Sequence, residues 1–398
     1  MVTYQGIGVR RCTPSFSHLF YISMIRVLLT GGGSGGHIYP LLAVTEEFEK
    51  MPDVNVQLSY LGPRGPFDAI LKEKDITVYS IASSKLRRYF SVANFIDVPK
   101  LFLSFFQSLY WVYKIMPDVV FSKGGPGAFP VVLAARFYFI PVIIQDSDAV
   151  PGLTNRLCGH FATRIAVSFP ETVKYFPKSK TAVVGNPIRK EIMEGAFRKE
   201  QAREYFKLNP LRSTILVLGG SQGAAQINSF IFNNLKVLIE DDIQIIHQVG
   251  PGNKREADDT VRSLQREIGE QLNSGYSSFE LLDVLQYKNA FSAADIVLSR
   301  SGSTIFEIAF FGKASILVPL ESAANDHQRA NAYSYARSGA AVVLEKENFT
   351  PHIVLSKIKE LLSHADMLHA MELAAKNFSR PNAAKEIAEE IITFGLRK

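Results

Sequence analysis

A histidine directly follows five glycines and a serine in the segment GGGSGGHIYP, residues 31–40. The preceding residues, MIRVLL, are apolar, so a buried strand, a glycine loop and a helix are predicted in succession. Backbone N–H groups at such a helix start bind phosphate. Because a phosphate site needs only backbone groups, the imidazole of His37 indicates proton-transfer chemistry next to a phosphorylated ligand.

Two other interpretations of this glycine loop stay open. Residues 31–36 match the G-x-G-x-x-G pattern of dinucleotide-binding domains, so a nicotinamide-dependent oxidoreductase is one alternative. That domain needs an acidic residue at the end of its second strand, whereas the strand VNVQLSYLG ends in Leu61 and Gly62. A purely structural turn accounts for Gly31 and Gly36, but it does not account for His37.

A second glycine loop occurs in the other half of the chain. The segment LVLGGSQGAA, residues 216–225, again joins an apolar run to a helix start. This loop can bind a diphosphate through the backbone N–H groups of its glycines and of Ser221 and Gln222, together with the Ser221 hydroxyl. Arg189 in VVGNPIR follows another apolar run near the middle of the chain, where a guanidinium can reach the same phosphates.

Polar residues also begin two later helices of this half. In SRSGSTIFE, Glu307 follows Thr304 by three residues, and in NDHQRANA, Gln328 follows Asn325 by three. Each pair matches a capping box, which is the structural alternative to a binding role. Because all of these helix starts follow parallel strands of one domain, we expect them to crowd one crevice.

The triplet Asp146, Ser147 and Asp148 raises the possibility of a metal site, as in some sugar-nucleotide transferases. We set this possibility aside, because those enzymes have a single nucleotide-binding domain, whereas the second glycine loop here can neutralise a diphosphate without metal. The eight histidines are not spaced as zinc ligands. No metal and no cofactor are therefore expected.

Composition favours a folded two-domain protein. The chain has 398 residues, of which 47% are hydrophobic and 21% charged, so extensive disorder is excluded. A formal net charge of +6 suits an anionic substrate or membrane surface, and we expect no nucleic-acid partner. The two cysteines, Cys12 and Cys158, provide no disulfide or metal framework and favour a reducing compartment. No apolar run is long enough to predict a transmembrane helix.

Apolar runs that end in glycine or polar turns alternate with helical patterns, which is typical of parallel β/α units. One such run is SFELLD, residues 278–283, and the series restarts at STILVLGG. We therefore predict an α/β fold with two Rossmann-like domains whose parallel sheets face a cleft. The predicted parts are an N-terminal extension (1–23) that we expect to be disordered, an N-terminal domain (24–187), a C-terminal domain (188–380) and a C-terminal amphipathic helix (381–398) that packs back on the N-terminal domain.

The motifs GGGSGGHIYP, PGLTNRL, VVGNPIR, LVLGGSQGA, HQVGPGN, ADIVLSRSGSTIFEIAFFGK and DHQRANA occur in this order. Together they resemble the MurG family of bacterial glycosyltransferases, from Met24 to the C-terminus. The resemblance implies the GT-B glycosyltransferase fold and an inverting transfer of N-acetylglucosamine from UDP-N-acetylglucosamine to the muramoyl 4-hydroxyl of lipid I, which makes lipid II for peptidoglycan. It also implies a peripheral enzyme at the cytoplasmic face of the bacterial inner membrane. A related lipid glycosyltransferase with a diacylglycerol acceptor is the alternative within this fold.

The resemblance assigns a role to each matching position. It makes 24–187 the acceptor and membrane domain and 188–380 the donor domain, with His37 as the general base. The implied donor-binding residues are Arg189, Ser221, Gln222, Val284, Glu307, His327 and Gln328. The implied acceptor-binding residues are Ser34, Gly35, Gly36, Gly124, Gly125, Asp148 and Asn155. The family commonly has His-Glu-Gln-Asn at residues 145–148, a departure that concerns the fine acceptor contacts and not the reaction class.

Residues 85–116 are rich in aromatic and apolar side chains. One helical stripe is predicted to face the core, and it consists of Phe102, Phe105, Phe106, Leu109, Val112, Tyr113 and Met116. The apolar residues off this stripe are predicted to rest at the headgroup level of an anionic membrane, and they are Phe90, Phe95, Leu103, Tyr110 and Trp111. The cations expected around them are Lys85, Arg87, Arg88, Lys100 and Lys114.

Overall fold

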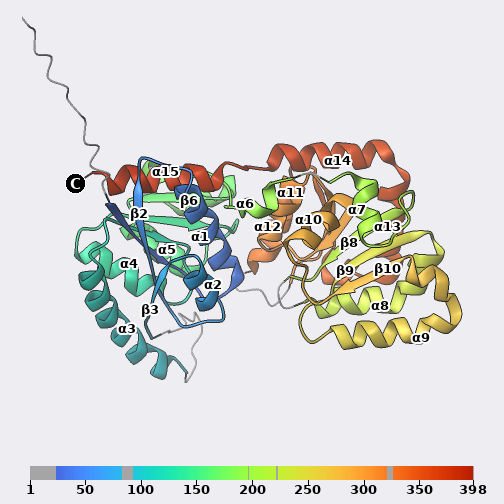
Figure 1. The fold of residues 1–398 in the computed structure, drawn as a ribbon, viewed down its shortest axis with the longest axis horizontal. Coiled ribbons are helices and arrows are strands. Elements are labelled where there is room, and N and C mark those ends of the chain that lie inside the picture. Colours follow the sequence, from blue (N-terminus) through green and yellow to red (C-terminus); the bar gives the residue numbers. More distant parts are fainter. Residues whose placement is uncertain (1–23, 83–92, 196, 221–222, 321–325, 398) are drawn as a thin grey trace, which may run out of the picture.

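The protein is described by a computed structural model over residues 24–82, 93–195, 197–220, 223–320 and 326–397. These residues form two α/β units side by side, each with one parallel sheet flanked by helices (Figure 1). The predicted fold class is confirmed.

The first sheet contains β1 (Met24–Thr30), β2 (Asn55–Gly62), β3 (Thr77–Ser80), β4 (Val119–Ser122), β5 (Val142–Asp146), β6 (Arg164–Val167) and β7 (Thr181–Val183). Their spatial order is β3-β2-β1-β4-β5-β6-β7, and all neighbours are parallel. The order reverses between β1 and β4, which is where a crevice forms outside the strand ends. The helices of this unit are α1 (Gly35–Phe48), α2 (Asp68–Glu73), α3 (Ala93–Ile115), α4 (Ala128–Phe137), α5 (Leu153–Phe161), η1 (Pro170–Tyr175) and η2 (Lys178–Lys180).

The second sheet contains β8 (Ser213–Leu218), β9 (Ile243–Gln248), β10 (Tyr276–Phe279), β11 (Ile296–Ser299), β12 (Ala314–Leu317) and β13 (Ala341–Val343). Their order is β10-β9-β8-β11-β12-β13, again all parallel, with the reversal between β8 and β11. The helices that follow the first unit are α6 (Lys190–Met193), α7 (Lys199–Tyr205), α8 (Ala225–Glu240), α9 (Lys254–Asn273), α10 (Val284–Ala293), α11 (Thr304–Phe310), α12 (His327–Ala336), η4 (Lys346–Asn348), α13 (Pro351–Ser363), α14 (Ala365–Phe378) and α15 (Ala383–Gly395).

The last helix, α15, crosses back to the first unit (Figure 1). Its side chains Ile387, Ile391 and Ile392 are buried in the core cluster that β1 and α1 share. A Cβ at Gly395 would lie 2.4 Å from Ile25 Cγ2, so this helix end packs tightly on β1. The first core is therefore built from both ends of the described chain.

Part of the junction between the units is packed with aromatic side chains. The Phe169 ring of the first unit lies 5.2 Å from the Phe306 ring and 5.8 Å from the Phe378 ring of the second. Phe169 and Phe306 are both buried. Aromatic pairs at these distances contribute about 0.5–1.5 kcal/mol each beyond the burial of their area. The two units therefore have a defined relative orientation.

The strand predicted at residues 278–283 is shifted in the structure. Strand β10 begins at Tyr276 and ends at Phe279. The residues after it leave the sheet, because Asp283 and Gln286 form a capping box that starts α10 at Val284. The apolar residues Leu281 and Leu282 therefore lie in the loop before that cap.

The predicted core-facing stripe of α3 is wrong for most of its members. Phe102, Phe106, Tyr113 and Met116 are exposed, while Val112 is buried. The positions that complete the buried face are Ser104 and Ser108, whose hydroxyls donate to the carbonyl oxygens of Leu101 and Ser104. Because these serines satisfy their own polar groups on the helix, they occupy a core face that sequence alone assigns to larger residues.

The off-stripe residues of α3 have different environments. Leu103 and Tyr110 are exposed, as predicted. Trp111 is not, because its ring packs on Tyr79 of β3 at a centroid distance of 4.5 Å. Phe90, Lys85, Arg87 and Arg88 lie outside the described residues, as does the side chain of Phe95. Within the described residues, no helix combines the length and the hydropathy that crossing a bilayer requires.

Candidate functional site

His37 lies in the first turn of α1, immediately after the glycine loop that ends β1. Ser34 is the N-cap residue, but its hydroxyl makes no capping bond and instead lies 2.7 Å from His37 Nδ1. When Nδ1 carries the proton and donates it to Ser34, the lone pair of Nε2 is free to accept another. In this tautomer, Nε2 is the ring nitrogen that can act as a base.

The protonated form of His37 is disfavoured by its surroundings. Burial and, to a smaller extent, the cation of Lys123 lower the pKa of His37 to about 4, against the opposing effect of the Asp148 carboxylate. The helix N-terminus also disfavours a positive charge at this position. The imidazole is therefore neutral near pH 7 and able to accept a proton.

A second glycine turn closes against the His37 ring. Gly125 has a φ of +87°, and a Cβ there would lie 2.8 Å from His37 Nε2 and 2.9 Å from Gly32 Cα. Gly124 has a φ of +77°, and a Cβ there would lie 2.2 Å from Asn155 Oδ1. Only glycine fits both the backbone conformation and the space. The fold therefore brings the two glycine turns, His37 and Asn155 into one place.

Lys123 is a charged residue of this site that the sequence reasoning missed. It follows β4 directly, is 3% exposed, and its backbone N–H donates to Thr30 O at 2.9 Å. Burial lowers its pKa to about 8 against the attraction of Asp146 and Asp148, whose charges raise it. The signal available in the sequence was a lysine between a buried strand and a glycine turn, FSKGG.

Asp148 reaches the opposite unit rather than standing free at the acceptor side. Its carboxylate Oδ1 accepts a hydrogen bond of 2.9 Å from Asn331 Nδ2 on α12. Its backbone N–H donates to Asp146 Oδ1 at 2.8 Å, which orients the loop after β5. Asn331 was not singled out from the sequence, although it lies in the motif DHQRANA.

Glu307 does not form the capping box with Thr304. Helix α11 has Ser303 as its N-cap, and no side chain makes a capping bond there. Glu307 Oε2 instead accepts a 2.5 Å hydrogen bond from the Tyr287 hydroxyl of α10. Burial raises the pKa of Glu307, while the Tyr287 bond and the Arg189 charge lower it. The carboxylate is thus held at a buried position by a partner on another helix.

Arg189 lies between the two units. It stands just before α6, and its guanidinium lies 4.3 Å from the centroid of the Tyr39 ring in α1. This cation–π contact links it to the helix that carries His37, while its charge acts on Glu307 in the second unit. Arg189 is therefore placed where a diphosphate between the units would meet a cation.

The remaining donor-side candidates lie at helix starts of the second unit. His327 and Gln328 begin α12, and Gln328 Oε1 accepts from Leu320 N at 3.0 Å. The cap position of α12 is Asp326, whose side chain makes no capping bond, and Asn325 lies outside the described residues. Val284 is half-buried at the start of α10.

Two predicted donor residues, Ser221 and Gln222, lie outside the described residues. On either side of them, Gly220 and Gly223 both have a positive φ, and Gly223 N donates to Gly220 O at 3.1 Å. These two glycines lie between β8 and α8, where a phosphate-binding loop is expected.

The two walls of the site approach closely at one point. A Cβ at Gly36, in the first turn of α1, would lie 4.0 Å from Ser303 Oγ, the N-cap of α11. The helix starts that carry His37 and Glu307 therefore face each other across the junction. This arrangement sets a proton acceptor on one wall against the Glu307 carboxylate on the other, with the Arg189 cation between them.

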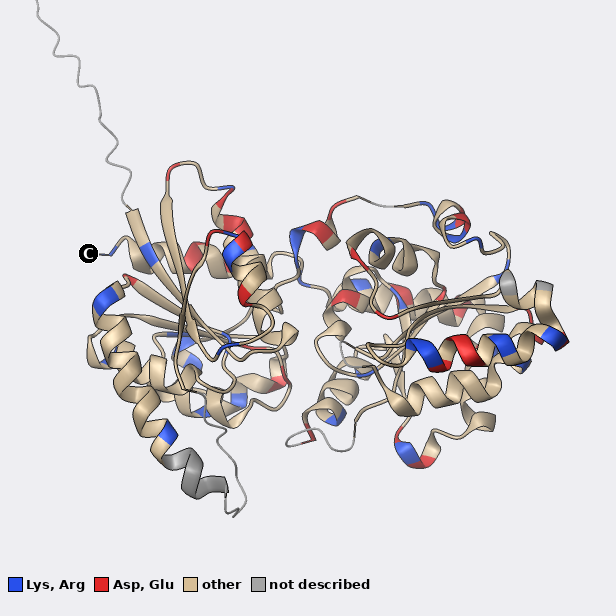
Figure 2. Cartoon of the chain, turned by 60° about the horizontal axis from the view of Figure 1, so that its bottom comes forward, with Lys and Arg blue, Asp and Glu red and all other residues tan. Residues whose placement is uncertain are grey.

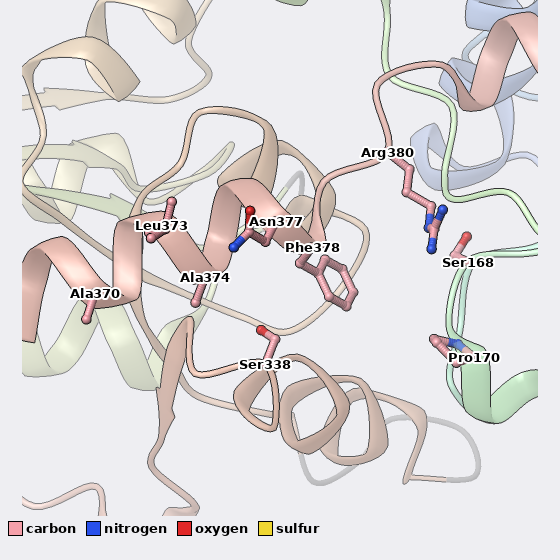
Figure 3. Close-up of a pocket in the computed structure, with 9 residues that line it drawn as sticks. All are labelled: Ser168, Pro170, Ser338, Ala370, Leu373, Ala374, Asn377, Phe378 and Arg380. Carbon is pink, nitrogen blue, oxygen red and sulfur yellow. The ribbon is translucent and has the colours of Figure 1, made fainter.

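Among the described residues, no group of three or more histidine, cysteine, aspartate or glutamate side chains is arranged to hold a metal ion. A separate cavity of about 450 Å³ lies at the junction where α14 leads into α15 (Figure 3). Its lining includes Ser168, Ser338, Phe378 and Arg380, and none of the candidate site residues contributes to it.

The chain matches the family described as Glycosyltransferase family 28 N-terminal domain over residues 27–167 and the Glycosyltransferase family 28 C-terminal domain over residues 214–387. The crystal structure of MurG from Acinetobacter baumannii has a TM-score of 0.70 at 27% identity, covering 93% of this chain and 99% of that one. The structure of MnaA from S. aureus with UDP has a TM-score of 0.66 at 16% identity, which shows a shared fold alone.

Curated relatives align over nearly the full length of both partners. The UDP-N-acetylglucosamine–N-acetylmuramyl-(pentapeptide) pyrophosphoryl-undecaprenol N-acetylglucosamine transferase of Thermodesulfovibrio yellowstonii is 36% identical over 372 residues, which cover 92% of this chain and 97% of that protein. The transferase of the same name from Clostridium kluyveri is 35% identical over 356 residues, covering 88% and 96%. The chain therefore belongs to glycosyltransferase family 28, among the UDP-N-acetylglucosamine–N-acetylmuramyl-(pentapeptide) pyrophosphoryl-undecaprenol N-acetylglucosamine transferases.

Proposed function

We propose that this chain transfers N-acetylglucosamine, with inversion, from UDP-N-acetylglucosamine to the muramoyl 4-hydroxyl of lipid I, giving lipid II and UDP. The names of the relatives support both substrates, and they favour neither a diacylglycerol acceptor nor a nicotinamide-dependent oxidation. The observation that carries the proposal is the neutral His37 on one wall of the junction opposite Glu307 on the other, with Arg189 between them.

His37 Nε2 is the general base in this proposal. It takes the proton of the attacking hydroxyl while the hydroxyl oxygen forms its bond to the anomeric carbon and the bond from that carbon to the UDP oxygen breaks. The hydrogen bond between Nδ1 and Ser34 orients the ring and supports the imidazolium that results. Negative charge that develops on the leaving diphosphate meets Arg189 and the N–H groups of the loop before α8.

Lys123 adjusts the strength of this base. In the protein alone, burial lowers the pKa of His37 and the positive charge of Lys123 adds to this effect, which makes the imidazole a weak base. An acceptor diphosphate bound at the adjacent glycine turns would offset that charge and raise the pKa of His37 toward the working pH. The acceptor would therefore strengthen the base only when it is bound. We propose no metal or other cofactor for this chemistry.

Release of UDP from UDP-N-acetylglucosamine tests the acceptor assignment. We expect release with a short-chain lipid I analogue and none above background with diacylglycerol or with no acceptor. Equal release with diacylglycerol would contradict the acceptor, and failure with every acceptor together with tight NADH binding would contradict the transferase itself.

We further propose that α3 and α4 dock on the anionic surface of the cytoplasmic membrane leaflet. Five apolar side chains of α3 and Met116, which directly follows the helix, are 44–64% exposed, and the five are Phe102, Leu103, Phe106, Tyr110 and Tyr113. Phe137 and Phe139 at the end of α4 extend this surface, since Tyr138 stacks near both Phe137 and Tyr113. Figure 2 shows that α3 is largely uncharged, with basic residues at intervals along it.

Exposed Lys100, Lys114 and Arg136 supply the positive charge of this surface. Each basic residue near an anionic bilayer contributes about 1 kcal/mol, and salt screens this part but not the apolar part. Phe102→Ser with Phe106→Ser should weaken sedimentation with anionic vesicles at all salt concentrations. Lys100→Glu with Lys114→Glu should weaken it mainly at low salt.

A matched control exists on the second unit, where Leu211 is 91% exposed. Leu211→Ser removes an exposed apolar side chain of similar kind and should leave vesicle binding unchanged. If the α3 variants sediment like wild type at low salt, this surface is not the docking site.

A further inference from the structure

Helix α12 carries three side chains that reach from the second unit to the first. They are spaced three residues apart, at Asn331, Ser334 and Arg337, and so lie along one face of the helix and its C-terminal end. Ser334 Oγ and Arg337 both donate to the carboxylate of Glu171 in η1, at 2.8 Å and 2.5 Å. This face of α12 therefore makes a polar contact between the units.

Asn331 makes the most buried of these contacts. Its Oδ1 accepts from Ala149 N at 2.7 Å, and its Nδ2 donates to Asp148 Oδ1 at 2.9 Å and to Ser301 O at 3.2 Å. The residue is 1% exposed. Since the Ala149 N–H requires an acceptor and the Asp148 carboxylate requires a donor, only one orientation of the amide fits.

The three partners of Asn331 belong to the two walls of the site. Asp148 and Ala149 form the loop after β5, and the Asp148 carboxylate acts on the charge of His37. Ser301 belongs to the loop between β11 and α11, the loop whose Ser303 lies against the start of α1. One buried amide thus joins the wall with the base to the wall with Glu307.

We propose that Asn331 is a positioning residue for the transfer reaction, which sets the loop 146–149 and the start of α11 at the separation that the reacting groups require. This inference rests on the proposed function, and it concerns a residue that is not among the substrate-binding residues of that proposal. Aromatic packing of Phe169 on Phe306 and Phe378 holds the units together without Asn331. Loss of the amide is therefore expected to misalign the walls rather than to unfold the protein.

The test compares Asn331→Ala and Asn331→Asp with wild type. Because a misplacement of about 1 Å costs on the order of 100-fold in rate, Asn331→Ala should lower kcat by about 10- to 100-fold with the donor KM and UDP affinity within twofold of wild type. Asn331→Asp keeps the acceptor for Ala149 N–H but opposes Asp148, so its kcat should fall at least as far. In the double variant Asn331→Asp with Asp148→Asn, the side chain at position 148 donates the hydrogen bond and the side chain at position 331 accepts it. Its kcat should therefore rise above that of Asn331→Asp alone.

Tyr333→Phe is the matched control on the same helix. Its hydroxyl donates to Glu345 Oε1 within the second unit, so this variant removes a polar contact that does not join the units, and its kcat should stay at the wild-type value. Paired spin labels on the two units add a readout that needs no turnover, and Asn331→Ala should broaden their distance distribution.

The outcomes separate the two proposals. If the wild-type protein catalyses the transfer and Asn331→Ala has a normal kcat and an unchanged label distance, the positioning role is overturned and the proposed function stands. A lower melting temperature with normal kcat per folded molecule also overturns it, since that is a structural role only. Absence of wild-type transfer overturns the proposed function, and the label distances then still decide whether Asn331 sets the separation of the walls.

Discussion

Replacing Glu307 by glutamine should weaken binding of the sugar nucleotide. The structure removes the capping-box explanation of this residue, because its carboxylate is bonded to Tyr287 and not to the start of α11. The family resemblance implies that Glu307 binds the ribose hydroxyls of the donor, and a charged hydrogen bond of this kind contributes about 1.5–3 kcal/mol. At about 1.4 kcal/mol per tenfold change, Glu307→Gln should raise the donor KM by about 10- to 100-fold.

Tyr287→Phe is the control for the structural part of this effect. It removes the same 2.5 Å hydrogen bond but keeps the carboxylate, so it should lower the free energy of unfolding by about 1–3 kcal/mol and change the donor KM only a few-fold. Glu307→Gln keeps an oxygen that can accept from Tyr287, and it should destabilise the protein less.

Initial rates over a range of donor concentrations, together with urea denaturation of each variant, measure both quantities. The increase in donor KM should be larger for Glu307→Gln than for Tyr287→Phe, whereas the loss of stability should be larger for Tyr287→Phe. If both variants lose stability and neither changes the donor KM, Glu307 is part of a buried structural pair and does not contact the donor.

Three further predictions concern the wall that carries His37. Gly125→Ala should lower the free energy of unfolding by about 2 kcal/mol or more, because the new Cβ strains a left-handed backbone and meets His37. Gly152 is the control, since its φ is −61° and a Cβ there would have no atom within 4 Å. In a denaturation series, the free energy of unfolding of Gly152→Ala should stay within about 0.5 kcal/mol of wild type. Because His37 works as a neutral base and burial lowers its pKa to about 4, kcat/KM for the acceptor should hold as the pH falls from 8 to 5 and decline only near pH 4; a midpoint near 6.5 would contradict this environment. Lys123→Met removes the cation that lowers this pKa, so the acid limb should move to higher pH, and an unmoved limb would show that Lys123 does not act on His37.

The features of the fold that sequence reasoning predicted are those that local patterns determine. Apolar runs ending in glycine mark β1 and β8, because a buried parallel strand is apolar on both faces and the turn after it needs residues without a Cβ. The same patterns predicted His37 beside the glycine loop. In each of these cases the decisive contacts lie within about ten residues of one another in the chain.

The features that it missed depend on distant partners or on a single residue of register. The Thr304 and Glu307 spacing fits a capping box, but α11 is capped by Ser303, so Glu307 stands one residue too late for that role. On α3 the apolar residues surround the whole helix, so periodicity could not identify the buried side that Ser104 and Ser108 share. Asn331 finds its partners about 180 residues away, across the junction of two units.

The central claim, that His37 is the base of the transfer, is tested most directly by single-turnover kinetics with donor bound before the acceptor is added. For His37→Gln, we predict that the rate of the chemical step falls by about 100-fold or more, the contribution of a general base, while UDP affinity stays within twofold of wild type. An unchanged chemical step with UDP affinity reduced in proportion would contradict the account, because His37 would then support the donor site and take no proton.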